Sequence, residues 1–187
     1  LWSESFERPD DDVLILQNSF ASAVAGAIHV ELSPVEASRM AAARKIDPEV
    51  YQEYLQGRFF VDQGRPESIE KARVAFEKAI ALDPTFAPAH AGLADVFGWQ
   101  AYLYEEPFVY AAKTEAEARR AIELDPRHRG AHEYIGEAYL MAKQPDEARK
   151  HLQRLAEICG TQCEQYRDLQ RAIAESTASR LAAASAQ

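Results

Sequence analysis

Three Asp-Pro pairs divide the chain into segments of similar length. They end at Pro48, Pro84 and Pro126, which lie 36 and 42 residues apart. After each pair, apolar residues recur every three or four positions, the spacing that places them on one face of a helix. Asp-Pro also suits a helix start, because Asp caps free backbone N–H groups and Pro fits the first helical position. The sequence therefore predicts helices that repeat along the chain.

The segment after Pro126 shows the repeating unit most clearly. Its two expected helical faces carry His132, Ile135, Gly136 and Tyr139 on the first and Ala148, Leu152 and Leu155 on the second. This pattern resembles the W-x2-L-G-x2-Y…A-x3-F signature of tetratricopeptide repeats, with His in place of Trp and Leu in place of Phe. A unit of about 34 residues with small insertions would give the observed spacing. The resemblance implies a scaffold of stacked helix pairs that binds proteins or peptides.

We expect an all-α fold, a right-handed superhelix or α-solenoid of about three helix pairs. The pairs are expected over residues 47–84, 85–126 and 127–160, after an N-terminal segment and helix over 1–46 and before a capping helix and frayed tail over 161–187. The N-terminal helix is predicted to begin at the aspartates before Val13, to carry apolar residues from Val13 to Ile28 on one face and to stop at Pro34, and fraying is predicted from about Leu181. The middle pair carries about eight additional residues around YLYEEPFVY, which we interpret as an inserted loop.

Residues 1–126 resemble a junction in bacterial multidomain regulators, where a TolB-like domain precedes tetratricopeptide repeats. The likeness rests on the runs LWSESFERP, VLILQNSFASAVAGAIHVELSP and DPEVYQEYLQGRFF. It implies the interaction module of a regulatory or signalling protein, and the start at Leu1 leads us to expect a fragment or a processed chain. The last third is similar to small secreted bacterial repeat proteins with a cysteine pair before the final helix. That similarity implies, as an alternative, a periplasmic or secreted assembly protein with a disulfide.

The charge of the chain limits the class of partner. The formal net charge is −9 and the isoelectric point is near 5.1. Nucleic-acid-binding proteins display basic surfaces, so we expect no nucleic acid partner. A membrane span needs about 20 consecutive apolar residues, and charged or polar residues interrupt every segment here, so we expect no membrane partner in this chain.

Tetratricopeptide arrays line a concave groove with the first helix of each pair, so the resemblance also predicts which side chains a partner would meet. They are Tyr54, Arg58, Asp95, Trp99, Glu133, Glu137 and Met141. This aromatic and acidic set suits a basic or amphipathic segment laid along the groove. The alternative, that these charges form only a solvated surface, stays open. Relatives that hold chaperone C-termini grip a carboxylate with Lys, Arg and Asn, whereas the matching positions here supply only Arg58, so we do not expect that specificity.

Cys159 and Cys163 flank Gly160, where a turn would bring their Cα atoms within the range of about 4.4 to 6.8 Å that a disulfide needs. They form a disulfide in an oxidising compartment such as the periplasm, or remain packed thiols in the cytoplasm, and the sequence leaves both open. The C-x3-C spacing without a second ligand pair argues against zinc. His128 and His132 have a helical spacing, but His90 occupies the same repeat position as His132, so we expect packing rather than metal binding.

No P-loop, G-x-S-x-G or H-E-x-x-H motif occurs in the sequence. We therefore expect no enzymatic activity, no cofactor and no metal.

A second structural hypothesis is a homodimer, in which the inserted segment and the N-terminal helix form the contact. Clustered aromatic residues are enriched in the cores of interfaces, and this segment and its surroundings supply Trp99, Tyr102, Tyr104 and Phe108.

Overall fold

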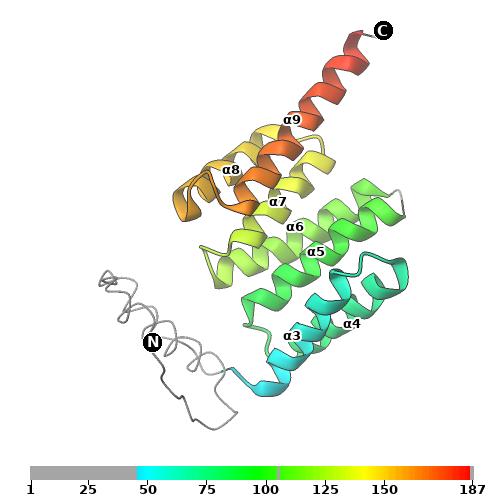
Figure 1. Cartoon of the computed structure of the whole chain (residues 1–187), viewed down its shortest axis with the longest axis vertical. Coiled ribbons are helices and arrows are strands. Elements are labelled where there is room, and N and C mark those ends of the chain that lie inside the picture. Colours follow the sequence, from blue (N-terminus) through cyan, green and yellow to red (C-terminus); the bar gives the residue numbers. More distant parts are fainter. Residues whose placement is uncertain (1–45, 105, 186–187) are drawn as a thin grey trace, which may run out of the picture. The chain divides into compact units, whose positions relative to one another are not determined.

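A computed structural model describes residues 46–104 and 106–185 of the chain. These residues form helices joined by short connections, without a strand (Figure 1). The helices are α3 (Pro48–Val61), α4 (Pro66–Leu82), α5 (Ala87–Leu103), α6 (Pro107–Leu124), α7 (Arg129–Met141), α8 (Pro145–Cys159) and α9 (Glu164–Ser185). The predicted all-α fold is confirmed, while the predicted N-terminal helix lies outside the described residues. The tail expected to fray from about Leu181 is helical to Ser185, because its alanines have the highest helix propensity.

Glu53–Gln187 form one compact unit, and the residues before it, Leu1–Gln52, form another. Within the larger unit, each helix from α4 to α9 packs on the next one in the chain. Contacts also join α5 to α7 and α7 to α9, so these three helices lie side by side (Figure 1). This layer forms the surface on which the candidate site lies.

The aspartates of the three Asp-Pro pairs make the same side-chain hydrogen bond. The side chains of Asp47, Asp83 and Asp125 each accept a hydrogen bond from the backbone N–H two residues later, at 2.8, 3.0 and 3.0 Å. Such bonds stabilise turns, which is why Asp is common there. Pro48 begins α3 as expected, whereas Pro84 and Pro126 lie in the turns before α5 and α7.

Two histidines tie the first helices of the second and third pairs to these turns. The Nε2 atoms of His90 and His132 lie 3.0 and 3.2 Å from the carbonyl oxygens of Pro84 and Pro126. A carbonyl only accepts, so each ring donates from Nε2. His128 has a different role, since its Nδ1 accepts a hydrogen bond from the N–H of Ala131 and caps α7.

The pKa values of the two equivalent histidines shift in opposite directions because their second partners differ. The Nδ1 atom of His90 lies 2.7 Å from a carboxylate oxygen of Glu117. Burial opposes the charge of this ring, but Glu117 and the Pro84 carbonyl outweigh it and raise the pKa of His90. The Nδ1 of His132 instead faces the Nδ1 of His151 at 2.9 Å, and burial lowers the pKa of both rings. Proximity to each other also lowers the pKa of His151, to about 4.

Close approach between helices depends on glycines that face large side chains. A Cβ atom on Gly57 of α3 or Gly92 of α5 would lie 2.5 Å from the ring of Phe76, which α4 inserts between them. A Cβ atom on Gly136 of α7 would lie 2.6 Å from Leu169 of α9. Real Cβ atoms do not come that close, so these positions admit only glycine without movement of a neighbour.

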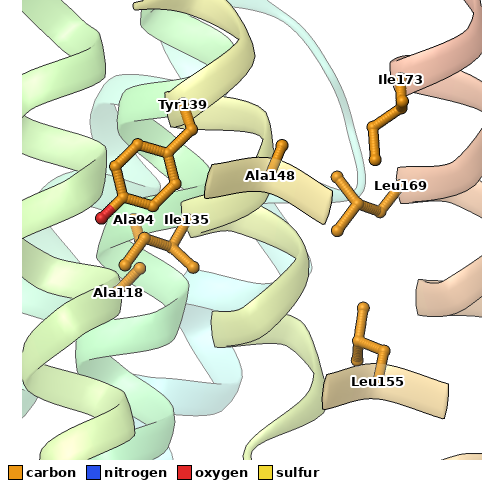
Figure 2. Packing of buried hydrophobic residues seen from close by; sticks show 8 residues of the cluster. All are labelled: Ala94, Ala118, Ile135, Tyr139, Ala148, Leu155, Leu169 and Ile173. Carbon is orange, nitrogen blue, oxygen red and sulfur yellow. The ribbon is translucent and has the colours of Figure 1, made fainter. Parts of the chain in front are cut away.

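Leu169 belongs to a buried cluster with side chains from five helices. Figure 2 shows its members: Ala94, Ala118, Ile135, Tyr139, Ala148, Leu155, Leu169 and Ile173. The branched side chains of α9 point toward α7 and α8, and alanines allow α5, α6 and α8 to approach (Figure 2). The final helix is therefore part of the core.

The segment YLYEEPFVY is not the inserted loop that the sequence suggested. Its residues extend the two helices of the middle pair, because α5 continues to Leu103 and α6 already begins at Pro107. These helices have 17 and 18 residues, against 13 and 15 in α7 and α8. Proline is favoured at the first position of a helix, and Pro107 begins α6. The additional residues are therefore part of the helices rather than of the connection between them.

Gly136→Leu should reduce the free energy of unfolding by about 1 to 3 kcal/mol, because the new side chain overpacks the contact with Leu169. Urea denaturation followed by circular dichroism measures the change. Gly98→Ala is a matched control on α5, since its Cβ would meet nothing within 4 Å. The control should stabilise the helix by about 0.5 to 1 kcal/mol, and a neutral Gly136→Leu would contradict the described packing.

Candidate functional site

A hollow of about 570 Å³ lies among α3, α5, α7 and α9. We call it the mixed hollow, because both charge signs line it. Its lining residues are Tyr54, Arg58, Pro88, Ala91, Gly92, Asp125, Arg127, His128, Arg129, Gly130, Glu133, Tyr134, Glu164, Gln165 and Asp168. The acidic side chains of α9 face arginines from α3 and from the start of α7.

A second hollow of about 480 Å³ lies between α5, α6 and α7. We call it the acidic hollow, since the charged residues that line it are all carboxylates. Its lining residues are Ala94, Asp95, Gly98, Trp99, Tyr102, Thr114, Glu133, Tyr134 and Glu137. Glu133 and Tyr134 line both hollows, so the two adjoin and form one groove across the layer of first helices.

The structure brings most of the predicted groove residues to these hollows. Tyr54, Arg58 and Glu133 line the mixed hollow, and Asp95, Trp99 and Glu137 join Glu133 in the acidic one. Met141, the last residue of α7, lines neither. Met141 lies one helical turn after Glu137, at the end of α7 and beyond the residues that line the acidic hollow.

The sequence prediction missed lining residues from three helices. They are Tyr134 of α7, Thr114 of α6, and Glu164 and Asp168 of α9. Tyr134 directly follows Glu133, and the two side chains share this surface. Glu164 and Asp168 are four residues apart, so the sequence places both carboxylates on one face of α9. This face was not assigned to the groove because α9 was predicted only as a capping helix.

Tyr134 and Asp95 connect neighbouring first helices at the centre of the groove. The hydroxyl of Tyr134 donates a hydrogen bond to Asp95 across 3.1 Å. Arg58 of α3 interacts with both residues. Burial nevertheless raises the pKa of Asp95 to about 6, because the hydrogen bond from Tyr134 and the charge of Arg58 offset it only in part.

Glu133 and Glu137 are held in a more unfavourable environment. Burial and then the charges of Glu137, Asp168, Asp95 and Glu164 raise the pKa of Glu133 to about 8. Burial and the charges of Asp95 and Asp168 raise the pKa of Glu137 to about 7, although Arg171 acts in the opposite direction. Within the described part of the chain, neither glutamate has a salt-bridge partner. A cation entering the groove would supply the missing opposite charge.

The sulfur atoms of Cys159 and Cys163 are bonded to each other in the structure. Their Cα atoms lie 5.9 Å apart, within the range that disulfides occupy. The bond joins the end of α8 to the residue before α9. The pair lines neither hollow.

Residues 46–104 and 106–185 contain no group of three or more His, Cys, Asp or Glu side chains arranged to hold a metal ion. Over the same ranges, no helix is long and apolar enough to cross a bilayer. The side chains that line the two hollows offer charge, hydrogen bonding and aromatic contact.

No protein-family model matches the sequence. Among solved structures, the first TPR domain of human RPAP3 matches with a TM-score of 0.58 at 18% identity, over 70% of this chain and 94% of that one. The chain has the tetratricopeptide-repeat fold. The first TPR of Spaghetti (RPAP3) bound to the HSP90 peptide SRMEEVD has a TM-score of 0.56 at 18% identity, over 70% of this chain and 94% of that one. The TPR2B domain of yeast Sti1 in its pHsp70 complex has a TM-score of 0.55 at 18% identity, over 70% of this chain and 98% of that one.

One curated protein is similar in sequence. The chain is 30% identical over 93 residues to "Putative adenylate cyclase 3" of Rhizobium meliloti (strain 1021). The match covers 50% of this chain but only 16% of that protein. The chain thus spans a small fraction of that relative's length. The resemblance of residues 1–126 to a TolB-like junction stays a prediction.

Glu133→Gln should make the protein more stable at pH 8 and flatten the dependence of its stability on pH. The pKa of Glu133 rises from 4.5 to about 8 on folding, so the folded state keeps a proton that the unfolded state releases. The free energy of unfolding of the wild type therefore falls as the pH rises through this window. Urea denaturation of both proteins between pH 6.5 and 9 tests this, because the histidines that titrate in the lower part of this window are present in both and cancel in the difference. A constant difference between the two proteins at every pH would contradict the assigned environment of Glu133.

Proposed function

We propose that this tetratricopeptide-repeat module binds a basic or amphipathic protein segment in the groove over α5 and α7. The observation that carries the proposal is the group of half-buried carboxylates Asp95, Glu133 and Glu137, whose pKa values are all raised. Lysine or arginine side chains would relieve their repulsion, and the exposed rim residue Trp99 offers aromatic contact. The fold supports this role, since the similar structures of Spaghetti and Sti1 are complexes with an HSP90 peptide and with pHsp70.

The charge of the groove argues for a ligand unlike the one bound by Spaghetti. The peptide SRMEEVD has one arginine against three acidic side chains and a terminal carboxylate. In this chain, Asp95, Glu133 and Glu137 would repel such a peptide. The three arginines of the mixed hollow face Asp125, Glu133, Glu164 and Asp168, so that hollow offers no surplus of positive charge.

We place this module in a larger bacterial regulatory or signalling protein. The likeness of 93 residues to part of "Putative adenylate cyclase 3" supports that context, as does the resemblance of the N-terminal half to a TolB-like junction. The module itself would select a partner and would leave catalysis to other parts. A periplasmic or secreted assembly protein is the alternative, supported by the disulfide between Cys159 and Cys163.

Acetylated hexalysine amide, a basic model peptide, should bind to the wild-type chain in isothermal titration calorimetry at pH 8 and low salt. Replacing Asp95 with Asn and both Glu133 and Glu137 with Gln should weaken binding by about tenfold or more, because this removes the charges that attract the peptide. The peptide SRMEEVD should show no binding to the wild type.

The matched control for this experiment changes the net charge equally at exposed sites outside both hollows. It combines Glu67→Gln, Glu123→Gln and Glu175→Gln. Its affinity for hexalysine should stay near the wild-type value. Equal losses in the two triple variants would show that net charge rather than the groove attracts the peptide, and would exclude the proposed function.

A second candidate function is homodimerisation through the lengthened end of the α5–α6 pair. Large apolar side chains are exposed there: Tyr102 at 79%, Tyr104 at 47%, Phe108 at 59% and Val109 at 53%. If this end forms a dimer, the mass from light scattering should double with increasing concentration, and Phe108→Ser with Val109→Ser should prevent the change because they remove apolar contact area. A monomer throughout the concentration series would exclude this candidate. The contribution predicted for the N-terminal helix lies outside the described residues.

A further inference from the structure

The acidic hollow has a buried hydroxyl group that the fold itself does not use. Thr114 of α6 lines this hollow and is only 1% exposed. Among the described residues, its Oγ1 has no hydrogen-bond partner and is the only buried side-chain polar atom in that state. Burying a hydroxyl without a partner is unfavourable, and native proteins contain few such groups.

The glycine at position 98 is a second feature that the folded chain does not explain. Gly98 lies inside α5, where glycine weakens a helix relative to alanine. A Cβ atom added there would meet nothing within 4 Å, and the backbone does not adopt a positive φ at this residue. Neither packing nor backbone conformation therefore requires glycine, whereas an occupant of the hollow beside it would need this space.

The remaining lining residues indicate the chemistry of such an occupant. Asp95 of α5 and Glu133 and Glu137 of α7 supply carboxylates from two helices. Trp99 and Tyr102 lie at the rim, 36% and 79% exposed, where their rings can contact an aliphatic chain or a cation. Acceptors on several sides suit an ammonium group, which donates three hydrogen bonds in different directions, better than a planar guanidinium group.

We propose that the acidic hollow receives one lysine side chain of the bound segment. Its ammonium group lies among the carboxylates and donates to the hydroxyl of Thr114, while its methylene chain passes Gly98 and contacts Trp99. This proposal rests on the proposed function and adds to it the identity of the anchoring side chain. The arginines of the mixed hollow then face the part of the segment beyond the anchor.

The side chain can be tested alone, with n-pentylammonium chloride as the probe. A titration of the wild-type chain followed by two-dimensional NMR should move the amide signals of Gly98 and Thr114 and the indole signal of Trp99, and the shifts should saturate. Pentan-1-ol, which has the same carbon chain without the charge, should produce no saturable shift. Equal responses to the two compounds, or no response to pentylammonium, would overturn the proposal.

Two variants separate binding from folding. Gly98→Leu should occupy the hollow, since a Cβ atom there meets nothing within 4 Å, and should abolish the pentylammonium shifts. Ala116→Leu, at an exposed position of α6, should leave them unchanged. Thr114→Val removes only the unused hydroxyl, so thermal stability should be kept or raised while pentylammonium affinity falls by about threefold or more. Wild-type affinity in either Gly98→Leu or Thr114→Val would contradict the assigned position of the ammonium group.

Hexalysine binding to Gly98→Leu distinguishes this proposal from the proposed function. A loss of affinity relative to Ala116→Leu supports both. Unchanged hexalysine binding to Gly98→Leu overturns the lysine anchor and leaves the acidic groove as a binding surface. If pentylammonium binds to the wild type but hexalysine does not, the hollow is an ammonium site and the groove is not a basic-peptide site.

Discussion

The close contact of helices at glycine is the constraint on which the rest of this structure depends. Phe76 fits between α3 and α5 only because Gly57 and Gly92 have no side chains, and Leu169 reaches α7 only because of Gly136. The second of these contacts holds α9 against α7, and α7 is also in contact with α5, so the three helices form one layer. The polar side chains on the other side of that layer are then brought close together, whatever their charges.

That crowding links the fold to the proposed activity. Asp95, Glu133 and Glu137 come from two adjacent helices, and burial raises the pKa of each. Neighbouring carboxylates raise the pKa values of Glu133 and Glu137 further. The folded chain accepts this unfavourable arrangement, and a cationic partner would relieve it. The fold alone does not specify the charge of such a groove, which depends on the side chains that line it.

The sequence was most informative where the structure depends on local spacing. The Asp-Pro pairs and the face containing His132, Ile135 and Gly136 predicted the helices of the third pair, because turn bonds and helical periodicity involve residues close in the chain. The same approach misread YLYEEPFVY as a loop, since additional residues can extend two helices as readily as separate them. It also missed Thr114 and the α9 wall, because contacts between distant helices leave no periodic signal.

The bond between Cys159 and Cys163 lies directly before α9, a helix that lines the mixed hollow. This helix begins at Glu164, directly after the second cysteine, and contributes Glu164 and Asp168 to one side of the mixed hollow. The disulfide adds a second covalent connection at the joint between α8 and α9. That side of the groove is therefore fixed by more than the packing of α9 on its neighbours.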